Sequence, residues 1–133
     1  MIKIVILSRD PISRFNFHKI SEIDPDIKVF GNSRGDSGER LILSQKPQLI
    51  VMSPFLPGKG GIQLCKQLRK MARFTSTRII GLRKYRGEER LGKIPQAGFD
   101  SFLTTPVRKE KIYDLLQLHF NYNRVPDSLP SFI

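Results

Sequence analysis

Ser53 and the loop that follows it are the first place in this sequence where chemistry could be located. The apolar run Leu49–Met52 predicts a buried strand, and the Pro- and Gly-rich residues 54–61 predict a loop at its C-terminal end. In a parallel sheet, ligands bind at that edge. A serine hydroxyl reacts only with an activating base or a kinase, and no histidine neighbours Ser53 in sequence. The chain also lacks a P-loop, a dinucleotide fingerprint and a Cys/His pair, so we expect no enzyme activity.

Five short apolar runs would place this loop at one edge of a sheet. We expect strands at Ile2–Leu7, Ile27–Phe30, Leu49–Met52, Ile79–Leu82 and Ser101–Leu103. Because these runs alternate with helical patterns, they predict an α/β fold, with a five-stranded parallel sheet and helices on both faces. At 133 residues, without repeats or a linker, the chain is expected to form one domain.

Helical patterns fill the intervals between the runs. The first helix should begin at Asp10-Pro11, with Asp10 as its N-cap. Its inner side is expected to carry Ile12, Phe15, Ile20 and Ile23. Further helices are expected over Glu39–Gln45, over Ile62–Met71 and after Pro106, whereas residues 31–38 indicate a turn-rich link. Two glycines and a proline at positions 87, 92 and 95 predict a poor helix before the fifth strand.

Composition narrows the class of protein further. The hydrophobic content of 39% fits a globular domain, and no apolar run approaches the ~20 residues of a membrane span. The first residues are strand-like, unlike a signal peptide. The single cysteine, Cys65, fits a reducing cytoplasm, and its place on an apolar helical stripe predicts a buried structural thiol. His18 and His119 stand apart from other ligand types, so we expect no metal and no cofactor.

Positive charge is concentrated in one part of the chain. The formal net charge is +11, and the segment Lys66–Lys93 holds ten basic residues against two acidic ones. Such a segment suits an acidic partner, a nucleic acid or an anionic surface, and it equally suits a solvated basic face that keeps the protein soluble.

Motifs at the strand ends resemble those of the receiver domain of two-component response regulators, from about Ile2 to Tyr122. "KIVILSRDP" is similar to the family's first strand, which ends in acids that hold Mg²⁺, and "KPQLIVM" to the entry of its third strand. Ser53 followed by "LPGKGG" resembles "D-x-x-M-P-x-x-x-G", whose Asp accepts the phosphoryl group. "RIIGLRKY" and "AGFDSFLTTPV" resemble the fourth and fifth strands.

This resemblance implies the architecture in more detail. It implies a flavodoxin-like, three-layer α/β/α sandwich with strand order 2-1-3-4-5. The receiver-like domain would cover residues 1–122, followed by an extended or disordered tail at residues 123–133.

Carried over residue by residue, the resemblance implies a receiver without its chemistry. Ser53 stands at the phosphoacceptor position, and Ser8, Arg9 and Asp10 stand at the acidic cluster, of which only Asp10 keeps a carboxylate. The switch positions hold Arg83 in place of Ser or Thr, Phe102 as the usual aromatic, and Thr105 in place of Lys. Mg²⁺ requires several oxygen ligands, and even two unit charges ~4 Å apart interact by about 4 kcal/mol at an effective dielectric of ~20, so a guanidinium at that distance would oppose the ion. The alternative to metal binding at Asp10 is a structural role as a helix cap.

The altered pocket inverts the sign of the charge. Two guanidiniums, from Arg9 and Arg83, face one carboxylate, and three hydroxyls surround them. The set predicts an anion site, in which a phosphate-like group or a partner's Asp or Glu docks. In the alternative, Arg9 pairs with Asp10 or Asp100, Arg83 points to solvent, and nothing binds.

The function expected from the sequence is that of a pseudo-receiver, a phosphorylation-independent protein-interaction module in the cytoplasm. Its partner would be another signalling protein with an acidic contact surface. Together with Arg9 and Arg83, the contact residues would be Tyr85, Arg86, Arg90, Lys109 and Tyr113. The alternative function is non-specific nucleic-acid or anion binding through Lys66–Lys93, although the sequence has no recognisable nucleic-acid-binding motif.

Overall fold

Parallel β-strands form the centre of the molecule, in a computed structural model that describes residues 1–92 and 94–126. The strands are β1 (Ile2–Leu7), β2 (Ile27–Asn32), β3 (Leu49–Met52), β4 (Arg78–Arg83) and β5 (Ser101–Thr104). They pair in the order β2-β1-β3-β4-β5, and every pairing is parallel. The predicted flavodoxin-like sheet and its strand order are confirmed.

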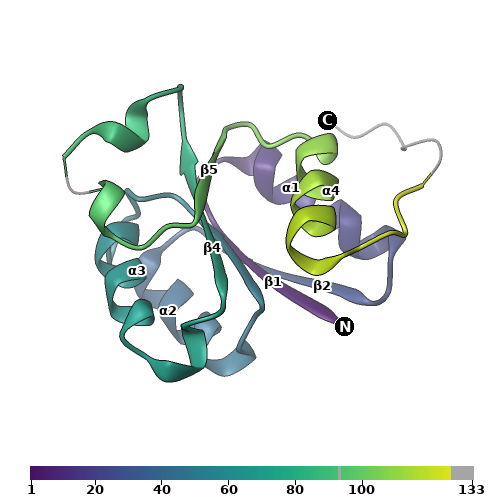
Figure 1. The fold of residues 1–133 in the computed structure, drawn as a ribbon, viewed down its shortest axis with the longest axis horizontal. Helices are drawn as coiled ribbons and strands as arrows, with labels where there is room; N and C mark the ends of the chain where they lie inside the picture. Colours follow the sequence, from purple (N-terminus) through teal and green to yellow (C-terminus); the bar gives the residue numbers. More distant parts are fainter. Residues whose placement is uncertain (93, 127–133) are drawn as a thin grey trace.

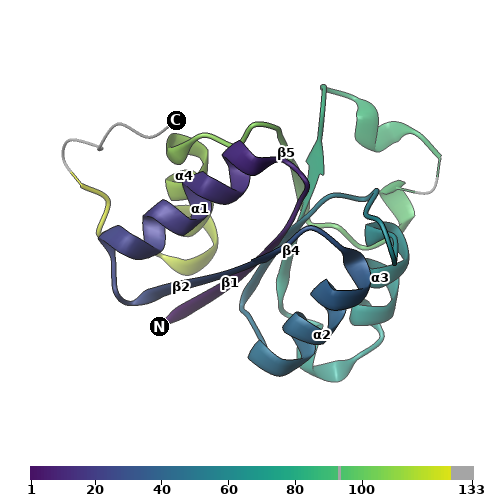
Figure 2. The same ribbon diagram turned by 180° about the vertical axis from the view of Figure 1, so that it is seen from behind.

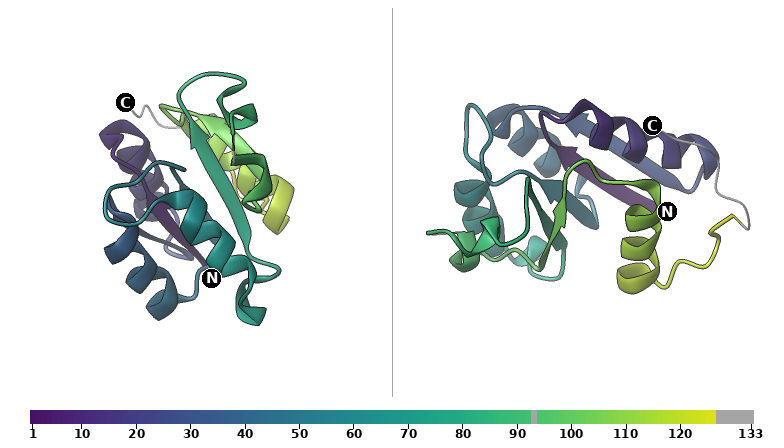
Figure 3. Two further views of the ribbon diagram at one scale, coloured as in Figure 1. Left: turned by 90° about the vertical axis from the view of Figure 1, so that its left-hand side faces the viewer. Right: turned by 90° about the horizontal axis from the view of Figure 1, so that it is seen from above.

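Within the described residues, four α-helices cover the sheet on both faces. Helices α1 (Pro11–Ile23) and α4 (Lys109–Phe120) lie on one face, and α2 (Gly35–Gln45) and α3 (Gly61–Arg69) lie on the other (Figures 1 and 2). The sheet therefore separates two helical layers (Figure 3).

Strand residues alternate between two apolar cores. Along β1, Ile4 and Ile6 face α1 and α4, whereas Val5 and Leu7 face α2 and α3, and all four are fully buried. This alternation follows from the two-residue period of a strand. Because both faces are covered, the central strand β3 is apolar throughout.

Helix α1 is rotated relative to the expected orientation. Its buried residues are Ser13, Asn16, Phe17 and Ile20. The expected inner residues Ile12, Phe15 and Ile23 are instead 36%, 38% and 41% exposed. The prediction was right for Ile20 and wrong for these three residues, because two polar side chains occupy the inner stripe. The amide Nδ2 of Asn16 donates to the carbonyl of Val107 at 2.9 Å, and the Ser13 hydroxyl accepts from the Val107 N–H at 2.8 Å.

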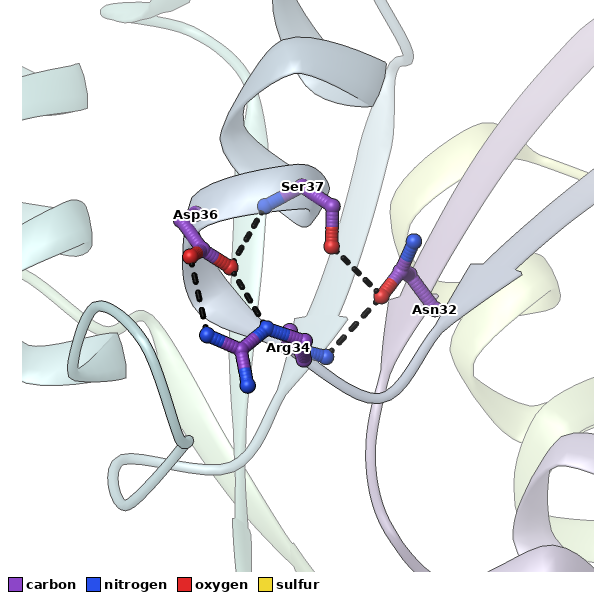
Figure 4. Close-up of polar contacts among 4 residues, drawn as sticks. All are labelled: Asn32, Arg34, Asp36 and Ser37. Carbon is purple, nitrogen blue, oxygen red and sulfur yellow. Dashed lines mark hydrogen bonds and ion pairs between the residues drawn. The ribbon is translucent and has the colours of Figure 1, made fainter.

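Helix α2 begins inside the stretch expected to be a turn-rich link. Asn32 accepts hydrogen bonds from the N–H of Arg34 at 3.0 Å and from the Ser37 hydroxyl at 2.9 Å, which turns the chain into the helix (Figure 4). Gly35, the first residue of α2, lies so close to the Lys59 carbonyl that a Cβ there would meet the oxygen at 1.6 Å. The glycine thus permits close packing rather than ending a helix.

The link between β4 and β5 forms short 3₁₀ turns at Glu88–Arg90 and Ile94–Gln96. In its described residues, which exclude Lys93, it holds no α-helix. The expected poor helix is therefore absent there, because Gly87 and Gly92 adopt left-handed backbone angles, with φ of 90° and 60°. The fold's fourth α-helix is consequently the C-terminal one.

The chain after α4 stays attached to the domain as far as the structure describes it. The Tyr122 hydroxyl donates to Asp24 at 2.6 Å, and the Arg124 guanidinium pairs with Asp24 at 3.1 Å and with Asp26 at 3.0 Å. Burial and, after it, the hydrogen bond to Asp24 raise the pKa of Tyr122 to about 12. Of the tail expected at residues 123–133, residues 127–133 lie outside the described residues.

Cys65 faces the core of the α2 and α3 layer and is fully buried, as expected for a structural thiol. Burial raises the pKa of this thiol to about 11, so it remains protonated at neutral pH.

Within the described residues, no helix is both long and apolar enough to cross a membrane.

Candidate functional site

A cleft of about 740 Å³ opens at the C-terminal ends of the strands. This edge is where parallel α/β sheets bind ligands. Its lining includes six of the residues selected from the sequence, namely Ser8, Arg9, Asp10, Ser53, Arg83 and Thr105. The parallel topology brings them together because each follows or ends a strand. The lining also includes Ile12, Phe55, Lys84 and Glu88, which the sequence did not single out.

Asp10 is held by hydrogen bonds from the start of α1. Its carboxylate accepts from the Ser13 N–H at 3.1 Å and from the Ser13 hydroxyl, which makes it the N-cap of the helix. The Ser8 hydroxyl accepts from the Asp10 N–H at 3.0 Å, and Ser8 is only 3% exposed. The capping interpretation of Asp10 is confirmed.

Ser53 turns its hydroxyl toward its own loop. The oxygen accepts from the Phe55 N–H at 3.2 Å and donates to the Phe55 carbonyl at 3.3 Å. No histidine lines the cleft. The carboxylates of the described cleft residues, Asp10 and Glu88, accept hydrogen bonds from Ser13 and Lys84, and neither is bonded to Ser53 as an activating base would be.

Arg83 forms an ion pair within the chain. Its guanidinium binds the carboxylate of Glu89, which the 3₁₀ turn Glu88–Arg90 supplies, and it donates through Nε to the Thr104 hydroxyl at 2.9 Å. The Arg83 and Glu89 side chains are only 19% and 23% exposed. The hydrogen bond from the backbone N–H of Glu89, together with the positive charge of Arg83, holds the pKa of Glu89 below its ordinary value. Arg83 thus does not point to solvent, and its guanidinium is already paired with an anionic group of the chain.

Thr105 and Phe102 are the other two residues that the family resemblance assigned to switch positions. The Thr105 N–H donates to the Arg83 carbonyl at 2.8 Å, which ties the end of β5 to the end of β4. Phe102 lies outside the cleft lining and packs on Phe99, with ring centroids 5.2 Å apart. A Cβ at Gly81 would meet the Phe102 ring at 2.3 Å, so the ring lies across β4 where only glycine leaves room.

Arg9, like Lys84, is an exposed cation of the cleft. Among the residues that the structure describes, its side chain has no hydrogen bond or ion pair, and Asp100 pairs instead with Arg69 at 2.8 Å. The expected pairing of Arg9 with Asp10 or Asp100 is therefore not found. Arg9 and Arg83, grouped together from the sequence, differ in that only Arg83 has a partner.

The expected partner-contact residues divide into two groups. Tyr85, Arg86 and Arg90 are exposed on the link between β4 and β5, and Lys109 lies partly exposed at the start of α4. Tyr113 is only 3% exposed and stacks on Tyr122 at 6.3 Å, so its expected role as a surface contact is wrong. The helical register places Tyr113 on the core side, beside Ile112 and Leu116.

The basic segment Lys66–Lys93 is partly neutralised by the fold. Besides Arg83, the guanidinium of Arg69 is committed, because it pairs with Asp100 and donates to the carbonyls of Phe74, Thr77 and Gly98. Lys93, the last residue of the segment, lies outside the described residues.

Glu88 and Glu89 are the site residues that the sequence pattern missed. In the sequence they are simply the two acids of a basic segment. In the structure Glu89 neutralises Arg83, and Glu88 accepts from the Lys84 N–H at 2.6 Å. A separation of six residues across a glycine turn gives no periodic signal that could have identified the Arg83–Glu89 pair.

The donors in the cleft fit a divalent cation poorly. Its two lining carboxylates, Asp10 and Glu88, already accept hydrogen bonds, and Arg9, Arg83 and Lys84 add three positive charges. Mg²⁺ requires several free oxygen ligands in near-octahedral geometry. Among the described residues, no three His, Cys, Asp or Glu side chains gather as a metal site would require.

Comparison with known proteins connects this cleft to a family. The model of the response regulator receiver domain matches residues 4–117. The chain is 26% identical over 118 residues to the transcriptional regulatory protein LiaR of Bacillus subtilis, covering 88% of this chain and 55% of LiaR. It is 27% identical over 114 residues to the nitrate/nitrite response regulator protein NarL of Escherichia coli, covering 85% of this chain and 52% of NarL. The chain thus spans about half the length of these curated relatives.

Solved structures share the fold at low identity. The chemotaxis response regulator CheY4 of Vibrio cholerae superposes with a TM-score of 0.77 at 17% identity, covering 90% of this chain and 99% of that chain. The receiver domain of the sensor histidine kinase PA1611 of Pseudomonas aeruginosa, which has a magnesium ion in its active-site cleft, gives a TM-score of 0.76 at 19% identity. That match covers 90% of this chain and 98% of the other.

We predict that Asp10 stabilises the fold as a cap and does not bind Mg²⁺. Asp10→Ala should lower the free energy of unfolding by about 0.5–2 kcal/mol, because the Ser13 N–H loses its acceptor. Asp10→Ser should retain most of the stability, since serine also caps helices. Urea unfolding with and without Mg²⁺ measures both effects. Stabilisation of the native chain by Mg²⁺, absent in Asp10→Ser, would show that Asp10 is a metal ligand instead.

The Arg83–Glu89 pair should respond to acid. Because the pKa of Glu89 lies below its ordinary value of 4.5, the stabilising effect of the pair is fully present above that pH. The effect is lost as the pH falls through the lowered pKa of the folded state. In an NMR titration, the Arg83 Nε–H resonance should shift over this acid range in the native chain and stay constant in Glu89→Gln. An equal titration in both proteins would mean that another group controls Arg83.

Proposed function

This chain belongs to the response regulator receiver domain family, and from that premise we propose that it is a receiver that signals without being phosphorylated. Receiver domains take part in signal transduction by interacting with other signalling proteins. In this proposal the chain keeps the interaction and has lost the phosphoryl switch. It is a binding module, not an enzyme, and it needs no cofactor.

The charge balance of the cleft carries this proposal. Three cations line the cleft against two carboxylates, and both carboxylates already accept hydrogen bonds from the chain. A phosphorylation site of this family would need a free carboxylate as acceptor and others to hold Mg²⁺. Ser53 offers a hydroxyl that is bonded to its own loop. Neither the acceptor nor the metal site is therefore supplied by the cleft residues.

The Arg83–Glu89 pair supports a single, constant conformation. In a phosphorylated receiver, the residue at this position hydrogen-bonds the phosphoryl group. Here Arg83 is bonded to Glu89 and Thr104, so the segment after β4 is held from within the chain. We infer that this internal ion pair fixes the surface that a partner recognises, independently of any phosphoryl donor.

The partner in this proposal is a signalling protein with an acidic contact surface, met in the cytoplasm. The formal net charge of +11 favours an acidic partner through long-range attraction. The exposed Tyr85, Arg86 and Arg90 add aromatic and guanidinium groups, which are common at protein interfaces. Two of the relatives are named as a transcriptional regulatory protein and a nitrate/nitrite response regulator, and this chain spans about half the length of each. Regulation of that kind would require protein segments in addition to the part that this chain matches.

Phosphoryl transfer tests the proposal directly. The native chain, incubated with acetyl phosphate and Mg²⁺, should show no gain of a phosphoryl group by intact-mass spectrometry. Ser53→Asp alone should also remain unmodified, because Arg9 and Arg83 still oppose the metal. Ser53→Asp combined with Ser8→Asp, Arg9→Asp, Arg83→Thr and Thr105→Lys should gain the group. Phosphorylation of the native chain on Asp10 or Ser53 would overturn the proposal.

A further inference from the structure

A second hollow, of about 710 Å³, adjoins the cleft on the side of α3. Its lining includes the loop residues Pro54–Pro57 and Ile62, with Arg9 and Lys66 as its charged members. We propose that an acidic segment of a partner protein docks in this groove, called the loop–α3 groove. The segment would contribute one large apolar side chain of its own to the contact. The inference rests on the proposed function and assigns its partner to a particular surface.

The loop that forms one wall of the groove is held in place by α2. The Gly35 N–H donates to the Pro57 carbonyl at 2.9 Å, and the Lys59 ammonium pairs with Glu39 at 2.9 Å. The Lys59 and Glu39 side chains are only 19% and 24% exposed. Because the wall is fixed before binding, little conformational entropy is lost when a partner docks.

Gly58 shows how closely the loop and α2 fit. A Cβ there would meet the Asp36 carboxylate at 2.5 Å and the Arg34 guanidinium at 2.7 Å. These two side chains form the ion pair at the start of α2 that is drawn in Figure 4. The Arg34–Asp36 ion pair at the start of α2 thus packs closely against the loop at Gly58.

Phe55 is the apolar anchor that the groove offers. Its side chain is 60% exposed although the adjacent Pro54 and Leu56 are buried. The Phe55 N–H is bonded to the Ser53 hydroxyl at 3.2 Å, and the Ile62 N–H donates to the Pro54 carbonyl at 3.3 Å. An aromatic ring exposed on a fixed backbone, beside Ile62, suits the core of a protein interface.

The charge of the groove selects the occupant. Arg9 and Lys66 are both cations, and no acidic residue is part of the lining. In the part of the chain that the structure describes, neither side chain has an ion pair. A second copy of this chain, also carrying +11, would be repelled, whereas an acidic segment would be attracted. Since Arg9 and Phe55 also line the cleft, the bound segment would border the former phosphorylation site.

A random 12-residue peptide library displayed on phage, selected on the immobilised full chain, tests this inference. Enriched peptides should combine Asp or Glu with a large apolar residue. Their affinity, measured by fluorescence polarisation, should fall about tenfold or more in Phe55→Ser and in Lys66→Glu. All variants are first compared with the native chain by amide NMR to confirm the fold.

Matched control variants carry comparable substitutions elsewhere on the surface. Leu118→Ser alters a side chain that is 77% exposed on α4, and Lys70→Glu alters an exposed cation at the other end of α3. Both should bind the peptides within about twofold of the native chain. Equal losses in control and groove variants, enriched peptides without acidic residues, or no enrichment would each overturn the inference. Displacement of the peptides by duplex DNA at groove residues would assign the surface to nucleic acid and also overturn it.

The same peptides separate this inference from the proposed function. Their affinity is measured again with Mg²⁺ and beryllofluoride, a mimic of the phosphoryl group. If binding needs Phe55 and Lys66 but changes with beryllofluoride, the groove is correct and phosphorylation independence fails. If the peptide affinity is unchanged both in the groove variants and on addition of beryllofluoride, the groove is not the docking site and the proposed function stands.

Discussion

The hydrogen bonds between Asp10, Ser13 and Val107 are the constraint on which the rest of the site depends. Ser13 and Asn16 are buried, so each must have a partner, and they find it in the backbone of Val107, which precedes α4. This connection joins the start of α1 to the end of β5. It holds Asp10 as a cap, and it turns α1 so that Ile12 and Phe15 face outward.

Opposite Asp10, the Arg83–Glu89 pair completes the cleft with groups from within the chain. At this edge of the sheet, where metal and phosphate could bind, the polar groups are engaged in a helix cap, a loop hydrogen bond at Ser53 and an internal ion pair. Each of these contacts is made within the chain. The chain has the receiver fold, and Arg9 is exposed to solvent at this edge.

The sequence predicted the sheet well because five buried strands carry a strong local signal, and parallel topology then brings Ser8, Ser53, Arg83 and Thr105 to one edge. The errors came from contacts that periodic patterns do not encode, some of them between distant residues. The inner face of α1 depends on Val107, which is 91 residues from Asn16. The start of α2 depends on Gly35 meeting the loop at Lys59. The partner of Arg83 depends on a 3₁₀ turn, and a periodic pattern contains none of this information.

Amide NMR of the labelled native chain, with and without Mg²⁺ and beryllofluoride, tests the central claim most directly. If internal contacts have replaced the phosphoryl switch, the resonances of Ser8, Ser53 and Arg83 should stay in place at saturating concentrations of both reagents. Large shifts confined to these residues would show that a carboxylate, Asp10 first, still assembles a metal and phosphoryl site. That result would contradict the account.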